Sequence, residues 1–179
     1  MVSVRVLRHS AAALAAVLLL TSCSAESSAS GPTLSLAEAK SSVQLLRNVA
    51  SERIPADVVE TVLVASDLSV SCESETEDPE GLMRAWRSGY RVSLVPSADP
   101  ETITSDLVAS FTDQGWKVES AAGASPIVLA REATFTDIQI SATNEVGRPA
   151  ELLLELTGVC VETGGENSAE VVELEALAY

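Results

Sequence analysis

Three cysteines and one histidine carry the most versatile chemistry in this chain of 179 residues. Thiols serve as nucleophiles, metal ligands or disulfide partners, and imidazole moves protons near neutral pH. Cys23, Cys72 and Cys160 lie far apart, so the sequence holds no C-x-x-C motif, and His9 falls within the first ten residues. What these side chains can do therefore depends on the segments that hold them.

The segment before Cys23 has the three regions of an export signal. Arg5 and Arg8 give it a positive start, residues 11–20 are a continuous run of Ala, Val and Leu, and the small residues Thr21 and Ser22 follow. The apolar run is about ten residues long, whereas a transmembrane helix needs roughly 20. We therefore interpret residues 1–22 as a cleaved signal peptide.

The end of this segment, Leu20-Thr21-Ser22-Cys23, resembles the lipobox of bacterial lipoprotein precursors. The resemblance implies that the Cys23 sulfur receives a diacylglyceryl group and that Cys23 becomes the mature N-terminus. Acyl chains such as palmitate would then anchor the protein in the cell membrane, on its extracytoplasmic face. Two chains give stable anchoring, whereas one chain binds only marginally. An ordinary secretory signal with an incidental Cys23 is the alternative.

The mature chain is strongly acidic. Loss of Arg5 and Arg8 leaves 9 of the 11 basic residues against 26 acidic ones, a net charge of −17. Such a surface repels phosphate, so nucleic acid is not an expected partner. The lipid on Cys23, rather than a basic patch, would hold the protein at the membrane. Residues 23–33, rich in Ser and Ala, are typical of a flexible tether.

Removal of His9 with the signal peptide leaves the mature chain without histidine. This excludes Ser-His-Asp and Cys-His catalysis, and also zinc and copper sites that depend on imidazole. A hydrolase with paired carboxylates remains a minor hypothesis. The acidic loop 73–80 lacks the glycine and the Asp/Asn pattern of an EF-hand, which favours a solvated loop. We expect neither an enzyme nor a bound cofactor or metal.

The two remaining cysteines, Cys72 and Cys160, would lie outside the cytoplasm. In an oxidising compartment they most simply form a disulfide with each other. Two free redox-active thiols are the alternative, which the missing C-x-x-C spacing disfavours.

A first helix is predicted after the tether. Ser35 and Glu38 form a capping box at its start, and Pro55 fixes its end near residue 53 or 54. Lys40 and Arg47 are predicted to lie off its apolar face. That face is formed by residues spaced three and four apart, namely Leu36, Ala39, Val43, Leu46 and Ala50.

A second helix is the clearest element of the sequence. Asp99 and Pro100 occupy the N-cap and N1 positions. Gly115 is expected in the left-handed conformation after the helix, which would bring Trp116 onto Phe111 in a Schellman ending. One face carries Ile103, Leu107 and Phe111.

Alternation of apolar and polar residues predicts the strands. The longest, Met83 to Val95, places Trp86, Tyr90, Val92 and Leu94 on one face together with Arg84, and Arg87 and Arg91 on the other. Val58 to Val64 is left open between a strand and a helical turn. The other predicted strands are Leu68–Cys72, Trp116–Val118, Ile127–Ala130, Phe135–Ala142 and a last one in which Leu152, Leu154, Leu156 and Cys160 share a face.

These elements predict a two-layer α+β domain over residues 34–162, with two helices packed on one face of a curved, mainly antiparallel sheet of four to five strands and closed by one disulfide. Residues 163–179 would form a tail, as a short helix or a loosely docked segment. The layout resembles small actinobacterial membrane lipoproteins of unassigned function. The features of this sequence on which the resemblance rests are a cysteine, an acidic loop, a Trp-bearing strand, an Asp-Pro helix start and the final Gly158-Val-Cys160.

Two functions fit this description besides the minor enzymatic one. The first is a non-enzymatic envelope lipoprotein that binds an envelope protein or has a structural role, with Arg84, Arg87 and Arg91 as the candidate binding surface. A sheet with one buried and one solvated face explains the same arginines without a partner. The second is a carrier that holds a small or lipidic ligand between helices and sheet.

Overall fold

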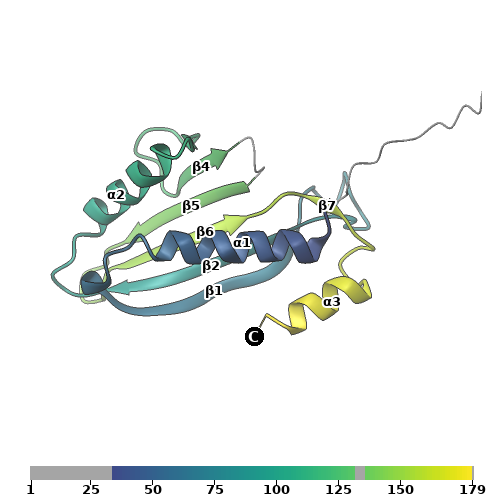
Figure 1. Ribbon diagram of the computed structural model, residues 1–179, viewed down its shortest axis with the longest axis horizontal. Coiled ribbons are helices and arrows are strands. Elements are labelled where there is room, and N and C mark those ends of the chain that lie inside the picture. The colour runs from purple at the N-terminus through teal and green to yellow at the C-terminus, as the bar shows by residue number, and fades with distance from the viewer. Residues whose placement is uncertain (1–33, 132–135, 179) are drawn as a thin grey trace, which may run out of the picture. The chain divides into compact units, whose positions relative to one another are not determined.

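The computed structural model describes residues 34–131 and 136–178. Over these residues the protein is an α+β domain with three α-helices and a seven-stranded antiparallel sheet (Figure 1). The strand order is β1-β2-β6-β5-β4-β3, and β7 pairs with the start of β2. The elements are α1 Leu36–Ser51, a 3-10 turn Ala56–Val58, β1 Val59–Ser71, β2 Met83–Leu94, α2 Pro100–Thr112, β3 Lys117–Val118, β4 Ile127–Arg131, β5 Thr136–Thr143, β6 Glu151–Thr157, β7 Val161–Glu162 and α3 Ala169–Ala176.

Both predicted helices begin where their capping residues predict. The Ser35 hydroxyl accepts the Glu38 N–H at 3.3 Å, and the Glu38 carboxylate accepts the Ser35 N–H at 2.9 Å, which completes the capping box. The hydrogen bonds from Ser35 to its carboxylate lower the pKa of Glu38. Asp99 caps α2 by accepting the Glu101 N–H, and the hydrogen bond that its carboxylate accepts from the Thr102 hydroxyl lowers the Asp99 pKa.

The end of α2 is a Schellman motif. Gly115 has a φ of 86°, and its N–H donates to the Thr112 carbonyl at 2.9 Å, while the Trp116 N–H donates to the Phe111 carbonyl at 3.2 Å. The rings of Phe111 and Trp116 meet edge to face, with centroids 5.7 Å apart. The predicted contact between these rings is confirmed.

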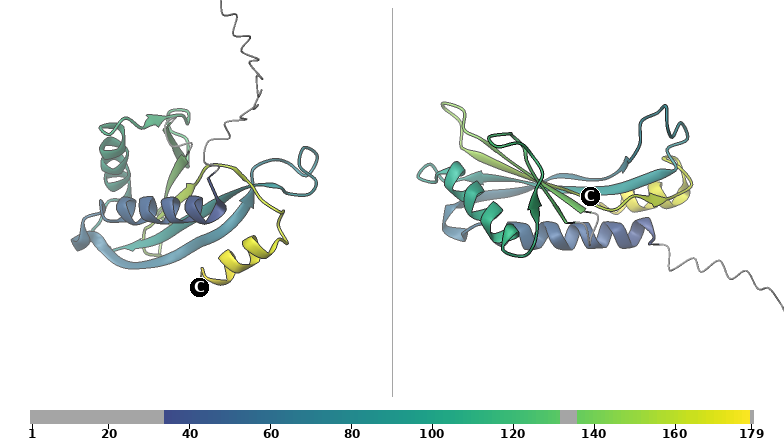
Figure 2. Two further views of the ribbon diagram at one scale, coloured as in Figure 1. Left: turned by 45° about the vertical axis from the view of Figure 1, so that its right-hand side comes forward. Right: turned by 90° about the horizontal axis from the view of Figure 1, so that it is seen from above.

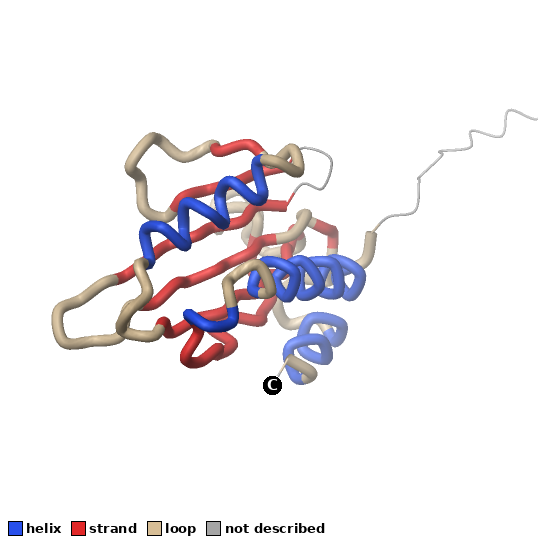
Figure 3. Tube along the Cα trace, turned by 60° about the vertical axis from the view of Figure 1, so that its left-hand side comes forward, coloured by secondary structure: helices blue, strands red, loops and turns tan. Residues whose placement is uncertain are grey.

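Helices α1 and α2 lie on the same face of the sheet, α1 over β2 and β6 and α2 over β5 (Figures 1 and 3). The core lies between these helices and the strands, and its largest fully buried side chains include Trp86, Phe111 and Leu94. Ile138 of β5 lies opposite Leu156 of β6, and both of these side chains are fully buried. No helix within residues 34–131 and 136–178 lies on the opposite face of the sheet, and the ends of the strands curve toward that open side (Figure 2).

The sheet is larger than predicted, with seven strands rather than four to five. The third helix, α3, lies in the tail for which a short helix was one of two predicted alternatives. Residues predicted as two segments, Val58 to Val64 and Leu68–Cys72, form the single strand β1, which settles the first of them as a strand. Strand β3 lies within the predicted strand Trp116–Val118, whereas the short strand β7 was not predicted. The predicted α+β class and antiparallel pairing are confirmed.

The last predicted strand is shorter than expected. Strand β6 ends at Thr157, so Cys160 lies in the connection to β7 and is exposed rather than turned toward the core. The predicted disulfide is nevertheless present, with the Cα atoms of Cys72 and Cys160 6.1 Å apart. It joins the start of the acidic loop to the β6–β7 connection.

The tail contains helix α3, which begins after the N-cap Ser168. Its Val171 is fully buried in the hydrophobic core, and Glu175 accepts the Ser69 N–H of β1 at 3.0 Å. The helix lies beside the β1 edge of the sheet (Figure 1). Within residues 34–131 and 136–178, no helix is long and apolar enough to cross a membrane.

Candidate functional site

The candidate site lies on the open face of the sheet, which none of the three helices in the described part of the chain covers. Arg87 of β2, Thr157 of β6 and Asp137 of β5 stand opposite one another in neighbouring strands and form one row across the sheet. Gln139 lies two residues further along β5, on the same face. Together these side chains give the open face a polar centre.

Arg87 lines an open hollow of about 480 Å³ in this row. Asp137, Gln139 and Thr157 line it from the neighbouring strands. The rest of its lining is the chain around the disulfide, formed by Val70, Ser71, Cys72, Ala85 and residues 158–160. A side chain of a partner could therefore enter beside the Arg87 guanidinium without displacing any element of the fold.

Arg87 differs from the other basic residues that the structure describes. Each of the others has a hydrogen bond, an ion pair, a ring contact or another electrostatic partner, whereas half-buried Arg87 has none within residues 34–131 and 136–178. A guanidinium carries five N–H donors in a planar fork that suits carboxylates and carbonyl oxygens. These donors are thus open to a group from outside the domain.

The other two predicted arginines lie in different surroundings. Arg91 shares the open face with Arg87 and faces Glu151 at 3.8 Å, with more than half of its side chain exposed. Arg84 is buried on the opposite face, where its guanidinium donates to the hydroxyl and the carbonyl of Ser69. The structure therefore brings Arg87 and Arg91 together on one face and places Arg84 inside the fold.

A buried polar network between α1 and the sheet was not predicted from the sequence. Asp67 of β1 accepts the Trp86 Nε1–H at 2.7 Å, the Ser88 hydroxyl at 2.8 Å and the Gln44 side-chain amide at 2.7 Å. Arg47 in turn donates to the Ser88 hydroxyl at 2.8 Å. This network ties α1 to β1 and β2 and so fixes the strand that carries Arg87.

Lys40 and Arg47 are buried on α1, which corrects the prediction that they lie off the packed face. The Lys40 ammonium lies 4.4 Å from the centre of the Trp86 ring and donates to the Leu174 carbonyl of α3. The Arg47 guanidinium lies 4.2 Å from the centre of the Tyr90 ring. Their apolar stems pack in the core while their charged ends find aromatic faces and oxygen acceptors.

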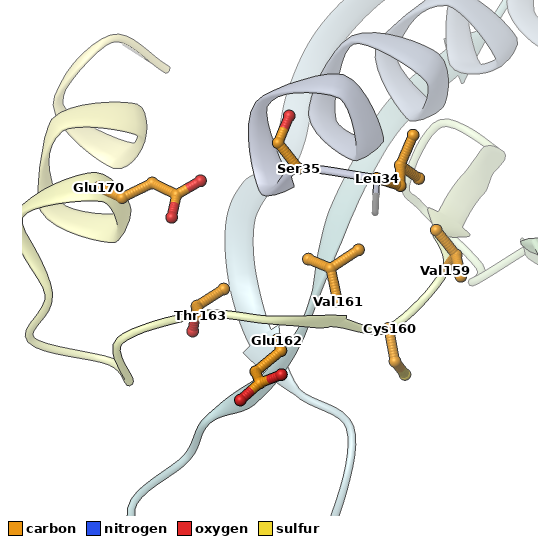
Figure 4. Close-up of a pocket in the computed structure, with 8 residues that line it drawn as sticks. All are labelled: Leu34, Ser35, Val159, Cys160, Val161, Glu162, Thr163 and Glu170. Carbon is orange, nitrogen blue, oxygen red and sulfur yellow. The ribbon is translucent and has the colours of Figure 1, made fainter. Parts of the chain in front are cut away.

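A second hollow, of about 710 Å³, lies where the start of α1, strand β7 and helix α3 meet (Figure 4). Ser35, Thr163, Glu162 and Glu170 supply its polar groups. The two carboxylates come from different elements and point in different directions (Figure 4). This arrangement offers no converging pair of acids of the kind that glycoside hydrolysis uses.

A third hollow, of about 460 Å³, lies between α2 and the strands β4 and β5. Val108, Ile127, Ile140 and Ala142 give it an apolar lining. It is the place where a small ligand between helix and sheet, as in the carrier hypothesis, would find room. Beneath α1, by contrast, fully buried side chains such as Trp86 fill the interface.

The acidic loop 73–80 is held by its own hydrogen bonds. Asp78 accepts the Met83 N–H at 2.7 Å, and such main-chain hydrogen bonds lower the pKa of Asp78. In the part of the chain that the structure describes, no three His, Cys, Asp or Glu side chains are grouped to hold a metal ion.

Comparison with known proteins adds no relative to this description. No protein-family model matches the chain, and neither a curated protein nor a solved structure matches it.

Proposed function

We propose that this protein is a lipid-anchored envelope lipoprotein that binds a protein partner on the open face of its sheet and catalyses no reaction. The observation that supports this function is Arg87, a half-buried cation without a partner in the described residues, in a hollow on an uncovered face. The sequence supports the anchor, through the lipobox-like residues before Cys23, which lie outside the described residues.

Arg87 would act as the anchor point of the interface. Arginine is enriched among the residues that dominate binding energies, because its planar fork makes paired hydrogen bonds and its stem packs on apolar groups. A partner carboxylate or carbonyl that enters the hollow would meet this guanidinium away from bulk water. Arg91 at the rim is already paired with Glu151 and would contribute little.

Replacement of Arg87 by alanine should weaken partner binding by about thirtyfold or more, since truncation of a central arginine costs about 2 kcal/mol or more. The measurement is capture of membrane proteins from detergent extracts by the full chain, with mass spectrometry of what is retained. Arg91→Ala is the matched control and should retain the partner. A protein that the unmodified chain and Arg91→Ala retain but Arg87→Ala does not would support the site. Equal capture by both variants and the unmodified chain would contradict it.

Replacement of Cys23 by alanine should release the protein from the membrane. The diacylglyceryl group on the Cys23 sulfur would then be missing, and an acidic surface offers no other attachment to the membrane. Intact mass and membrane partitioning of both forms give the test. The unmodified chain should show the mass of residues 23–179 plus acyl chains. A soluble form of that chain without acyl mass would contradict the anchor and leave the proposed binding face untouched.

A further inference from the structure

Strand β1 forms one edge of the sheet and exposes an unusual stretch of apolar surface. All residues from Glu60 to Ala65 are exposed. Three consecutive branched side chains, Val62, Leu63 and Val64, keep 45%, 61% and 54% of their surface in contact with solvent. A free edge strand of this composition is a template for pairing with another chain.

Every second residue of this stretch directs its main-chain groups away from the domain. Groups in an antiparallel strand alternate between its two sides. The Trp86 carbonyl accepts the Gly158 N–H, so Trp86 bonds away from β1, and its partner Ser69 must direct its own groups outward. Val64 opposite Tyr90 and Val62 opposite Val92 stand in the same phase of the ladder and direct their groups outward too.

The two halves of the β1 edge have different surroundings. Near its end, helix α3 covers β1, and Glu175 accepts the outward Ser69 N–H. Around Val62 and Val64, no main-chain hydrogen bond from elsewhere in residues 34–131 and 136–178 reaches the outward side of the strand. Register irregularities between Val59 and Thr61 and between Val64 and Ser66 flank this open stretch and leave it regular.

We propose that β1 pairs antiparallel with β1 of a second copy of this chain, about a two-fold axis at Leu63. Val62 of each copy would then lie opposite Val64 of the other, with outward main-chain groups on both that can form hydrogen bonds. Leu63 would meet Leu63, so the apolar stretch is complementary to itself. This inference does not rest on the proposed function.

Charge favours this register as well. Residues 61–65 carry no charged side chain, and the one carboxylate beside them, Glu60, would fall opposite Ser66 rather than opposite its own copy. Like charges directly opposite each other are therefore avoided. The net charge of −15 still repels a second copy at longer range, and salt screens that repulsion. Association of two copies should therefore strengthen as salt is added.

The test uses Leu63→Cys in the purified full chain, oxidised in solution. A residue on the two-fold axis lies opposite itself, so this variant should form a reducible dimer. Val118→Cys is the matched control, because Val118 lies on β3 at the other edge of the sheet and is 47% exposed. This variant should form several times less reducible dimer than Leu63→Cys. Adding Val64→Pro to Leu63→Cys should abolish the dimer, because proline lacks the outward N–H while the β1–β2 ladder keeps its bonds.

Sedimentation of the purified full chain in detergent gives a second measurement. A dimer whose fraction rises with NaCl supports the pairing. Equal cross-linking of Leu63→Cys and Val118→Cys together with a monomer at all salt concentrations overturns it. Retention of a different, basic protein on β1 that weakens with salt also overturns it, because the occupant is then a foreign strand rather than a second copy.

Discussion

Removal of the Cys72–Cys160 disulfide is expected to lower the free energy of unfolding by about 4 to 5 kcal/mol. The bond joins residues that are 88 positions apart. In the chain-entropy model, a closed loop of this length strongly restricts the unfolded chain. Because domains of ordinary size are stable by only about 5 to 15 kcal/mol, the loss should shift the unfolding midpoint by roughly 10 to 20 °C.

The test compares thermal unfolding of the unmodified chain and of Cys72→Ser/Cys160→Ser, each with and without reductant. Reductant should lower the midpoint of the unmodified chain and leave that of the double variant unchanged. Intact mass should show a gain of two hydrogens on reduction. An unmodified chain that is fully reduced but unfolds at the same temperature would contradict the expected stabilisation.

The parts of the fold that depend on neighbouring residues were predictable from the sequence. The capping box of Ser35 and Glu38, the N-cap Asp99 and the contact of Phe111 with Trp116 all join residues within five positions of each other. Such interactions form in the same way wherever the helix finally packs. The face of each residue in β2 was equally predictable, because side chains alternate along a strand.

The parts of the fold that depend on distant residues were not predictable from the sequence. Strand β7 has two residues and exists through its pairing with β2, so no period in the sequence indicates it. Strand β1 changes phase between Val64 and Ser66, which breaks the alternation that would have identified it as one strand.

The candidate site was likewise predictable only where it depends on neighbouring residues. That Arg87 and Arg91 share a face followed from their spacing. That Arg91 has an ion-pair partner and Arg87 has none among the described residues depends on β6, which joins the sheet from about 60 positions away. The burial of Arg84 likewise depends on Ser69 of β1. A sequence pattern places side chains on faces, but only the packed strands decide which cation keeps free donors.

Replacement of Asp67 by alanine is expected to lower the free energy of unfolding by about 3 to 5 kcal/mol, the range found when one member of a buried polar network is removed. The Trp86 Nε1–H, the Ser88 hydroxyl and the Gln44 amide would all lose their acceptor. Trp86 and Ser88 are fully buried, so water cannot replace the carboxylate without opening the contact between α1 and the sheet. Urea unfolding followed by tryptophan fluorescence measures the loss.

Asp67→Asn is the control that separates hydrogen bonding from charge. Its amide oxygen can still accept from Trp86 and Ser88, and a rotated Gln44 side chain can present its own oxygen to the new NH₂ group. The cost should therefore be about 1 kcal/mol or less. If asparagine were as damaging as alanine, the negative charge in the network that Arg47 joins would be the stabilising feature. If alanine were harmless, the network would not hold α1 to the sheet.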